Sequence, residues 1–426
     1  MFRKVVLVLV LLGMVGTFQT ALAQSLEEVL KEKGVITEED YKKIVKSRQV
    51  KYKAGKGLTL SAPDGKNSVT FGGQMQPQYD FKDSEKKQDI SKFEVKRVKI
   101  WFMGHAFSKD LTYKLQLRLS NIQGGDIKNG GLMEEAKINY RYRDGLQILF
   151  GQTKTRFGRQ AVLSSKKMHL VDKSQVTKAF FPTYDSGLML HGKIAEGLLH
   201  YEGFVSGGAG QNTWRENNRA AWNARLAVNP LGYMKYAEGD LADSEKPLVS
   251  IAANYYQNKL DDEEMVYGDT NHLGFLKPKK GWYAIGNSLS SDEDAIGDET
   301  VKFDMYGFDL AFMWKGLWLQ GEYMKGKAAG DFSKNELQAD GYYLQGSYFV
   351  ISKKLALGYR YSQFDPNDNV ADDNQIENTP GISWYVKGHA LKVQADYTNI
   401  QKESVLAKST DNTSDKRFRV QVQLLY

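Results

Sequence analysis

The chain has 426 residues, with 58 lysines and arginines against 51 acidic residues and a formal net charge of +7. It contains no cysteine, which excludes a disulfide framework and any thiolate metal site. The content of 24 Tyr, 20 Phe, 7 Trp and 40 Gly is typical of short aromatic strands joined by turns. A β-barrel grows by adding hairpins, so this length does not require several domains.

Residues 1–23 predict a secretory signal peptide. Arg3 and Lys4 precede the apolar run from Val5 to Phe18, and Ala21-Leu22-Ala23 supplies the small residues of a cleavage site. The remaining chain has no run of eighteen apolar residues, so any membrane crossing must be made by strands. The alternative is a soluble periplasmic or secreted protein.

Residues 24–56 predict a short helical segment on the periplasmic side. Ser25 caps the first helix, which Gly34 ends, and Thr37 caps the second. The apolar residues at helical spacing are Leu26, Val29, Leu30, Tyr41, Ile44 and Val45. We interpret this segment either as a trimerisation or peptidoglycan-side element or as a poorly ordered tail.

From residue 57 to residue 426 the period changes to two. Residues 111–120 alternate most cleanly, with leucines and Tyr113 on one face and polar residues on the other. Segments of about ten residues suit tilted membrane-crossing strands. The fold class is therefore all-β, a transmembrane antiparallel β-barrel of about 16 strands. The strands are predicted near 67–81, 93–107, 111–121, 133–143, 145–151, 185–194, 197–206, 219–229, 247–257, 302–314, 317–327, 340–350, 354–363, 381–387, 389–399 and 416–426.

The predicted connections alternate between short and long. Two- or three-residue turns such as 144–145 and 315–316 alternate with long stretches such as 152–184 and 258–301, and residues 230–246 are the one long exception among the turns. Outer-membrane barrels have this asymmetry, with tight periplasmic turns and long external loops. An even strand number predicts that both termini lie in the periplasm. The predicted location of the chain is the bacterial outer membrane.

The last strand predicts barrel closure. Phe418, Val420, Val422 and Leu424 alternate with polar residues up to Tyr426. Closure is required because unpaired backbone groups in hydrocarbon cost several kcal/mol each. We expect this strand to contact outer-membrane lipid and the barrel-assembly machinery.

Several motifs resemble the phosphate-selective porin O and P family of outer-membrane porins. They are Gly72-Gly-Gln-Met-Gln76, Phe93-Glu-Val-Lys-Arg-Val-Lys-Ile100, Gly151-Gln-Thr-Lys-Thr-Arg-Phe-Gly158, Val171-Asp-Lys-Ser174, Ala179-Phe-Phe-Pro182, Asp185-Ser-Gly187, Asn229-Pro-Leu-Gly232 and Gly307-Phe-Asp-Leu-Ala311. The family usually has Pro where this chain has Arg156, and a terminal Phe in place of Tyr426. The resemblance implies a homotrimer of sixteen-stranded barrels whose third external loop folds inward and whose lumen guides anions past basic side chains.

Basic residues are concentrated in loop 152–184, which has Asp172 as its one acid, and on polar strand faces. Rings of Lys or Arg select anions by replacing part of their hydration. The alternative is ordinary polar lining, which any lumen needs. The predicted anion-pathway residues are Arg97, Lys99, Lys114, Arg118, Lys137, Arg141, Lys154, Arg156, Lys166, Lys167, Lys173 and Arg225.

The predicted function is passive diffusion of small solutes through a porin that prefers anions, phosphate or related ones. A second hypothesis is a barrel that acts mainly as a surface binding or adhesion protein through loops such as 258–301. An enzyme is not expected, and a barrel hydrolase is a distant third reading. The six histidines show no metal-ligand spacing and the glycine clusters no nucleotide-binding pattern, so no cofactor, metal or nucleic acid is predicted.

Overall fold

The structure is a computed structural model that describes residues 26–41, 50–123, 126–127, 131–213, 218–261, 300–330, 336–407 and 410–426. The chain divides into two compact units, Met1–Lys51 and Tyr52–Tyr426. The predicted signal peptide, Ser25, and most of loop 258–301 lie outside the described residues. Within the described part, none of the helices has the length and apolar character needed to cross a membrane.

The first unit contains short helices. Helix α2 (Leu26–Glu32) is followed by Gly34 at φ +67°, a conformation that favours glycine. Residues 38–41 are also helical, and the Thr37 hydroxyl accepts a hydrogen bond from the Asp40 amide at 3.0 Å. This is the N-cap geometry expected of a threonine.

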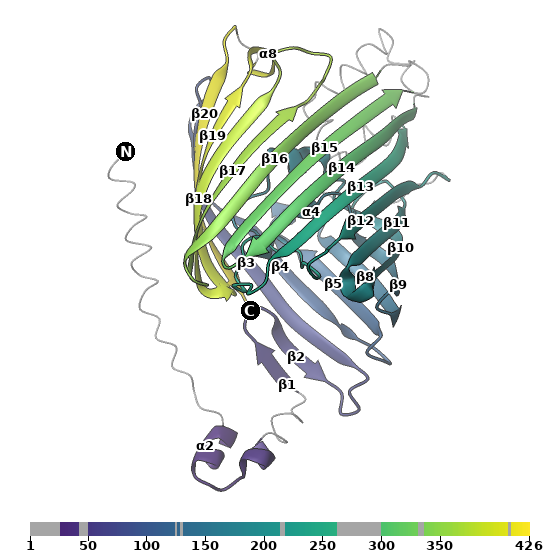
Figure 1. Ribbon diagram of the computed structural model, residues 1–426, viewed down its shortest axis with the longest axis vertical. Coiled ribbons are helices and arrows are strands. Elements are labelled where there is room, and N and C mark those ends of the chain that lie inside the picture. Colours follow the sequence, from purple (N-terminus) through teal and green to yellow (C-terminus); the bar gives the residue numbers. More distant parts are fainter. Residues whose placement is uncertain are drawn as a thin grey trace. The chain divides into compact units, whose positions relative to one another are not determined.

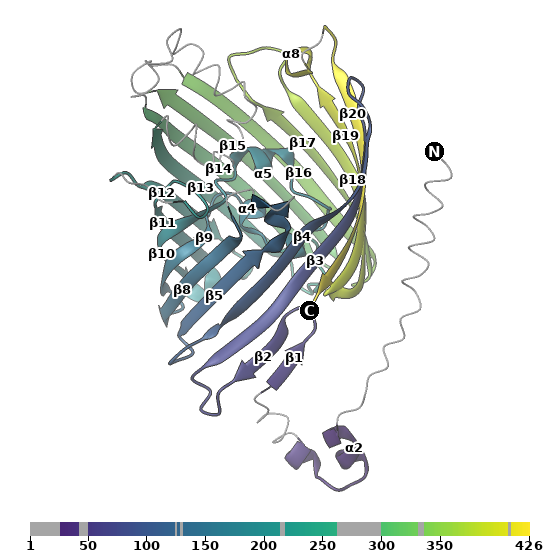
Figure 2. The same cartoon turned by 180° about the vertical axis from the view of Figure 1, so that it is seen from behind.

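Sixteen antiparallel strands form a closed barrel, as predicted (Figures 1 and 2). The ring closes where β20 pairs with β3, from Lys416 opposite Asp83 to Leu425 opposite Gln74. The strands are β3 (Ser68–Asp83), β4 (Ile90–His105), β5 (Leu111–Arg118), β8 (Met133–Arg143), β9 (Leu146–Lys154), β10 (Tyr184–Ile194), β11 (Leu199–Ser206), β12 (Ala221–Val228), β13 (Leu248–Asp261), β14 (Thr300–Trp314), β15 (Leu317–Gly330), β16 (Glu336–Ile351), β17 (Leu355–Asp365), β18 (Gln375–His389), β19 (Leu391–Lys402) and β20 (Thr413–Leu425).

Along most strands an apolar outer face alternates with a polar inner one, although on β14 inner residues such as Phe303 and Met305 are apolar and buried. On β12, Trp222 and Leu226 are exposed on the outside, whereas Asn223 and Arg225 are buried inside. Successive side chains of a strand point to opposite faces, so this pattern follows directly from the sequence. An apolar outer face with a polar interior is the arrangement of a membrane barrel.

The barrel has one end with tight connections and one with long ones, which we call the turn end and the loop end. At the turn end, β14 and β15 are joined by Lys315 and Gly316, both at positive φ, as a two-residue hairpin requires. Short helices and strands lie in some of the connections: η2 (Leu119–Asn121), β6 (Ile122–Gln123), β7 (Asp126–Ile127), η4 (Ala195–Gly197) and α8 (Ser404–Ala407).

Two strands begin earlier than the sequence predicts. Strand β16 begins at Glu336 and β18 at Gln375, each several residues before the predicted start. At the start of β16 the apolar residues Leu337 and Ala339 face inward and the polar Glu336 and Gln338 face outward, the reverse of the predicted pattern, and the start of β18 is mostly polar. Pairing with neighbouring strands nevertheless continues to these residues.

Just before β3 the chain forms a β-hairpin, whose first strand lies in the part of segment 24–56 that was predicted to be helical. Strands β1 (Val50–Lys53) and β2 (Gly57–Ser61) pair with each other, and β2 also pairs with β3 from Leu58 opposite Phe71 to Ser61 opposite Ser68. Gly57 has φ +111°, and a Cβ there would lie 2.0 Å from the Phe71 carbonyl oxygen. The close approach of the two backbones therefore requires glycine.

Candidate functional site

Residues 155–183, between β9 and β10, fold into the barrel, and we call them the inward segment. They contain α4 (Arg159–Val162), η3 (Ser165–Lys167) and α5 (Gln175–Phe180). Figure 2 shows α4 and α5 within the ring of strands. Phe157, Val176 and Phe180 are fully buried against inner residues of β14 to β16, such as Phe303 and Tyr343. The inward segment thus has an apolar core of its own with that wall.

Backbone amides of the inward segment are bound by acids of the wall. Glu322 on β15 accepts hydrogen bonds from the amides of Arg159 at 2.8 Å and Gln160 at 2.6 Å. Asp396 on β19 accepts one from the Val171 amide at 3.0 Å. A buried amide left without a partner would cost about 1–3 kcal/mol, so these acids fix the segment in place.

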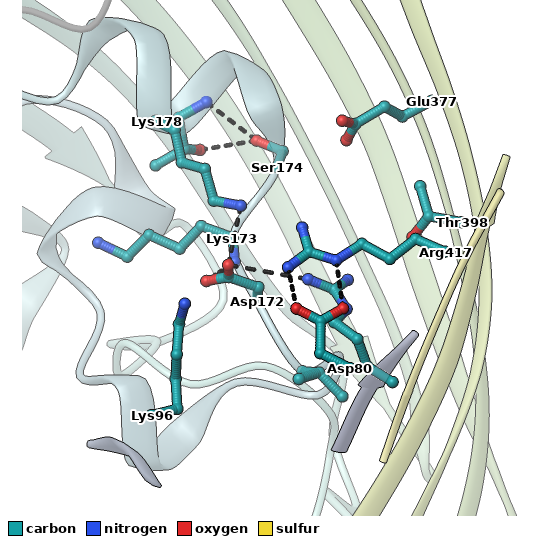
Figure 3. Close-up of polar contacts among 12 residues, drawn as sticks. Asp80, Lys96, Asp172, Lys173, Ser174, Lys178, Glu377, Thr398 and Arg417 are labelled. Atoms are coloured by element: carbon teal, nitrogen blue, oxygen red, sulfur yellow. Dashed lines mark hydrogen bonds and ion pairs between the residues drawn. The ribbon is translucent and has the colours of Figure 1, made fainter. Parts of the chain in front are cut away.

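Asp172 ties the inward segment to both sides of the seam, the place where β20 pairs with β3. Its carboxylate lies 3.2 Å from Arg97 on β4, 2.8 Å from Lys178 and 3.8 Å from Arg419 on β20. Burial opposes its ionisation, but Lys178 and Arg97 outweigh that effect, and the pKa of Asp172 lies well below its usual range. In Figure 3, Lys178 reaches Asp172, while the Lys173 side chain extends away from the neighbouring pair of Asp80 and Arg417.

Four inward bases of β4, β5 and β8 share two carboxylates. Lys99 contacts Glu134 at 2.6 Å, and Arg118 lies 3.9 Å from the same residue. Glu135 pairs with Lys114 and, at 3.0 Å, with Lys137. The consecutive acids both lie inside because the pairing of β5 with β8 shifts register between Gln116 and Leu117. Strict alternation would have placed one of them outside, and the sequence analysis gave neither a role.

Three further lysines reach the same region without a carboxylate partner among the described residues. Lys154 and Lys173 both donate to the Ala161 carbonyl at 3.1 Å. The Lys173 ammonium also lies 4.3 Å from the centre of the Phe181 ring, and Lys166 lies 4.5 Å from that of Trp101. Cation–π contacts attract these ammonium groups but do not neutralise them.

Burial changes the protonation of Lys166 and Lys173, two of the four lysines of the inward segment. Burial, and then the charge of Arg97, lower the pKa of Lys173 to about 7. Burial and the neighbouring Lys114 lower the pKa of Lys166 to about 8. Both groups therefore bind a proton less tightly than a free lysine, and a nearby anion would restore their charge. We call the eight bases of this region the basic cluster: Arg97, Lys99, Lys114, Arg118, Lys137, Lys154, Lys166 and Lys173.

The other four predicted residues have partners of their own. Arg225 forms a two-point ion pair with Asp309 and is 2% exposed. Arg156 contacts Glu202 at 3.1 Å, and Lys167 donates to a backbone carbonyl. Arg141 is exposed and pairs at 2.8 Å with Asp110, next to the turn before β5.

Residues 69–426 match the protein family described as phosphate-selective porin O and P. The chain belongs to this family. Porin O of Pseudomonas aeruginosa is 21% identical over 415 residues, covering 84% of this chain and 89% of that protein. An uncharacterized protein of Aquifex aeolicus strain VF5 is 25% identical over 435 residues, covering 92% and 93% of the two chains. Family membership makes the chain an outer-membrane porin of bacterial type.

Several solved outer-membrane proteins have the same fold. The anion-selective porin from Comamonas acidovorans superposes with a TM-score of 0.57 at 10% identity, covering 84% of this chain and all of that one. OmpF of Salmonella typhi gives 0.53 at 14% identity, covering 85% and 98%. A loop-deletion mutant of OmpT from Vibrio cholerae gives 0.54 at 12% identity, covering 85% and 100%. At these identities the likeness concerns the fold alone.

No group of three or more His, Cys, Asp or Glu side chains in the described part of the chain converges as metal ligands. The site contains instead more basic than acidic side chains, beside the inward segment that is fixed inside the barrel. Such an arrangement can attract, partly dehydrate and release an anion.

Proposed function

We propose that this porin allows passive diffusion of small solutes and prefers anions, phosphate or related ones, which pass along the basic cluster. The observation that supports it is the set of three lysines, Lys154, Lys166 and Lys173, without carboxylate partners among the described residues. An anion that enters a narrow passage loses hydration, and ammonium groups replace part of it. Weak, repeated binding along several bases would let the anion leave again.

We also propose how the barrel is oriented in the membrane and how many copies assemble. The turn end and both termini face the periplasm, because tight turns are periplasmic in such barrels. The protein forms a homotrimer, in line with the trimer form recorded for OmpT of Vibrio cholerae. The barrel itself catalyses no reaction.

Reconstitution into planar bilayers tests this function. We expect an open conductance and, in a potassium chloride gradient, a reversal potential that indicates preference for chloride. Titration of phosphate against chloride then ranks the two anions. Preference for potassium would contradict the anion proposal, and the absence of any conductance would favour a surface-binding barrel instead.

A charge-matched pair of double variants assigns the preference to the inward segment. Lys166→Gln with Lys173→Gln should reduce the ratio of anion to cation permeability several-fold, because two cations are lost from the passage. Lys109→Gln with Lys354→Gln removes the same charge from exposed positions and should leave the reversal potential unchanged. Equal effects of the two double variants would show that overall charge, rather than the cluster, sets the selectivity.

A further inference from the structure

Residues 229–247, between β12 and β13, are the long exception among the turn-end connections, and we call them the turn-end segment. At its start, the Asn229 amide donates to the Leu198 carbonyl at 2.7 Å, next to β11. Further on, Asp240 accepts from the Gly316 amide at 2.9 Å, in the β14–β15 turn. Asp243 accepts from the Ser352 hydroxyl at 2.9 Å, beyond β16. The turn-end segment therefore runs from β11 to the β16–β17 turn.

The middle of the turn-end segment contacts the inward segment through Glu238. This carboxylate accepts hydrogen bonds from the His169 amide at 2.8 Å and from the Gln160 side chain at 2.7 Å. It also accepts one from Gln345 on β16 at 3.2 Å, and the Glu238 amide donates to the Lys167 carbonyl at 3.1 Å. Glu238 is 1% exposed. One buried side chain thus connects the turn-end segment, the inward segment and the barrel wall.

Tyr236 makes a second connection two residues earlier. Its hydroxyl accepts a hydrogen bond from Arg225 at 3.0 Å and donates one to Glu202 at 3.2 Å. The Arg159 guanidinium lies 5.3 Å from the centre of the Tyr236 ring and donates to the Lys235 carbonyl at 3.2 Å. The helix α4 therefore rests on the turn-end segment as well as on the wall.

Together the two segments cover one side of the lumen. The inward side chains of Asp309, Glu322 and Gln345, on β14 to β16, are each 3% exposed. On the other side, the side chains of Lys114 and Arg118 on β5 remain 28% and 29% exposed. Lys114 and Arg118 on β5 thus stay far more accessible than the inner side chains of β14 to β16, whereas Arg97 on β4 is bound by Asp172 of the inward segment.

We propose that the turn-end segment is an internal strut that holds the inward segment against the β11–β18 wall and confines the solute path to the β5 and β8 side. Glu238 is its positioning residue. This inference rests on the proposed function, since it concerns the route of the solute. It explains why a connection at the turn end is long: a two-residue turn could not reach the inward segment.

Variants of Glu238 test the strut by its effect on the current. Glu238→Ala removes all the side-chain hydrogen bonds, so conductance should rise, open-channel noise should increase and anion preference should fall. Glu238→Gln retains one acceptor oxygen and should give intermediate values. Glu245→Ala, at an exposed position of the same segment, should behave like the unmodified protein. Unchanged conductance, noise and selectivity in a folded Glu238→Ala variant would overturn the role of Glu238.

Cysteine accessibility tests the route without altering Glu238. The chain has no cysteine of its own, so Lys114→Cys and Ser347→Cys each introduce the sole thiol; Ser347 lies on the inner face of β16 and is 4% exposed. A sulfonate-bearing methanethiosulfonate reagent should reduce the current through the Lys114→Cys channel and leave the Ser347→Cys channel unaffected. Equal modification of both variants would overturn the confinement of the solute path to one side of the barrel. Absence of current from the unmodified protein would instead overturn the proposed function.

Discussion

Lys166 and Lys173 have aromatic rings and carbonyl oxygens as neighbours, whereas Lys99, Lys114 and Lys137 have carboxylates. This difference decides which charges a passing anion meets. A lysine paired with a carboxylate contributes little net field, but an unpaired one contributes its full charge as long as it is protonated. Protonation of the inward-segment lysines is therefore a functional variable.

Anion preference should decrease as the pH rises. The pKa values of Lys173 and Lys166 are lowered to about 7 and about 8, and a lysine is cationic only below its pKa. Both are mostly charged at pH 6 and lose their charge between about pH 6 and 9, Lys173 before Lys166. Reversal potentials measured from pH 6 to pH 9 should move toward the value of a less selective channel.

Arginine variants are the control for this pH dependence. Lys166→Arg with Lys173→Arg should keep the selectivity of pH 6 up to pH 9, because arginine stays protonated throughout. A reversal potential of the unmodified protein that stays constant over this range would contradict the assignment of charge to these two lysines.

The sequence identified most bases of the site but not their partners. Eight of the twelve predicted residues come together in the basic cluster. Arg225 does not, because it pairs with Asp309, which lies 84 positions away in the chain on β14, across β13 from β12. Glu134 and Glu135 were missed because a register shift, invisible in the residue pattern, turns both inward.

At the scale of the element, the inward segment fits the wall through two glycines. A Cβ added to Gly358 on β17 would lie 2.4 Å from the His169 imidazole, and one added to Gly381 on β18 would lie 2.4 Å from Leu170. Neighbouring strands thus leave space for consecutive residues of the segment. His169 is fully buried, and burial lowers its pKa to about 3, so it packs there as a neutral side chain.

Gly358→Ala should displace the inward segment. The added methyl group overpacks the contact with His169, which typically costs about 1–3 kcal/mol. We expect a lower free energy of unfolding in urea and a noisier open channel. At Gly203 on β11 an added Cβ would meet nothing closer than 3.9 Å, so Gly203→Ala should be neutral. Similar losses of stability in both variants would contradict the steric argument.

Elements were predictable to the extent that their residues alternate. The sixteen strands follow from the period of two, and the inward fold of residues 155–183 was implied by family resemblance. The length of the turn-end connection was visible, but its contacts were not, because Glu238 and Tyr236 bind residues of distant strands. The β1–β2 hairpin was missed since both strands are short and β1 is exposed along its whole length.

At the scale of the whole molecule, the ring closes by mutual hydrogen bonds between Gly73 and Tyr426. The Gly73 amide donates to the Tyr426 carbonyl at 2.8 Å, and the Tyr426 amide donates back at 3.1 Å. The tyrosine ring covers Gly73 so closely that a Cβ there would lie 2.3 Å from it. This contact combines backbone pairing with aromatic cover at the seam.

Tyr426→Ala should weaken closure. Loss of the partly exposed ring removes roughly 1 kcal/mol of apolar burial and uncovers the Gly73 backbone. Folding into lipid vesicles, followed by the mobility shift of unheated samples in gels, should be slower and less complete. Tyr426→Phe keeps the ring and should fold normally. Equal folding of the alanine and unmodified chains would exclude a role for the ring.

The hairpin strand β2 has a consequence for how the seam is aligned. One edge of β3 is shared: β20 occupies it from Lys82 and Asp83 down to Gly73, and β2 occupies it from Phe71 onward. A shift of β20 by one residue toward the turn end would collide with Gly57 and Leu58. Because such a slip would exchange the inner and outer faces of a whole strand, β2 serves as a physical stop that fixes the alignment of the seam.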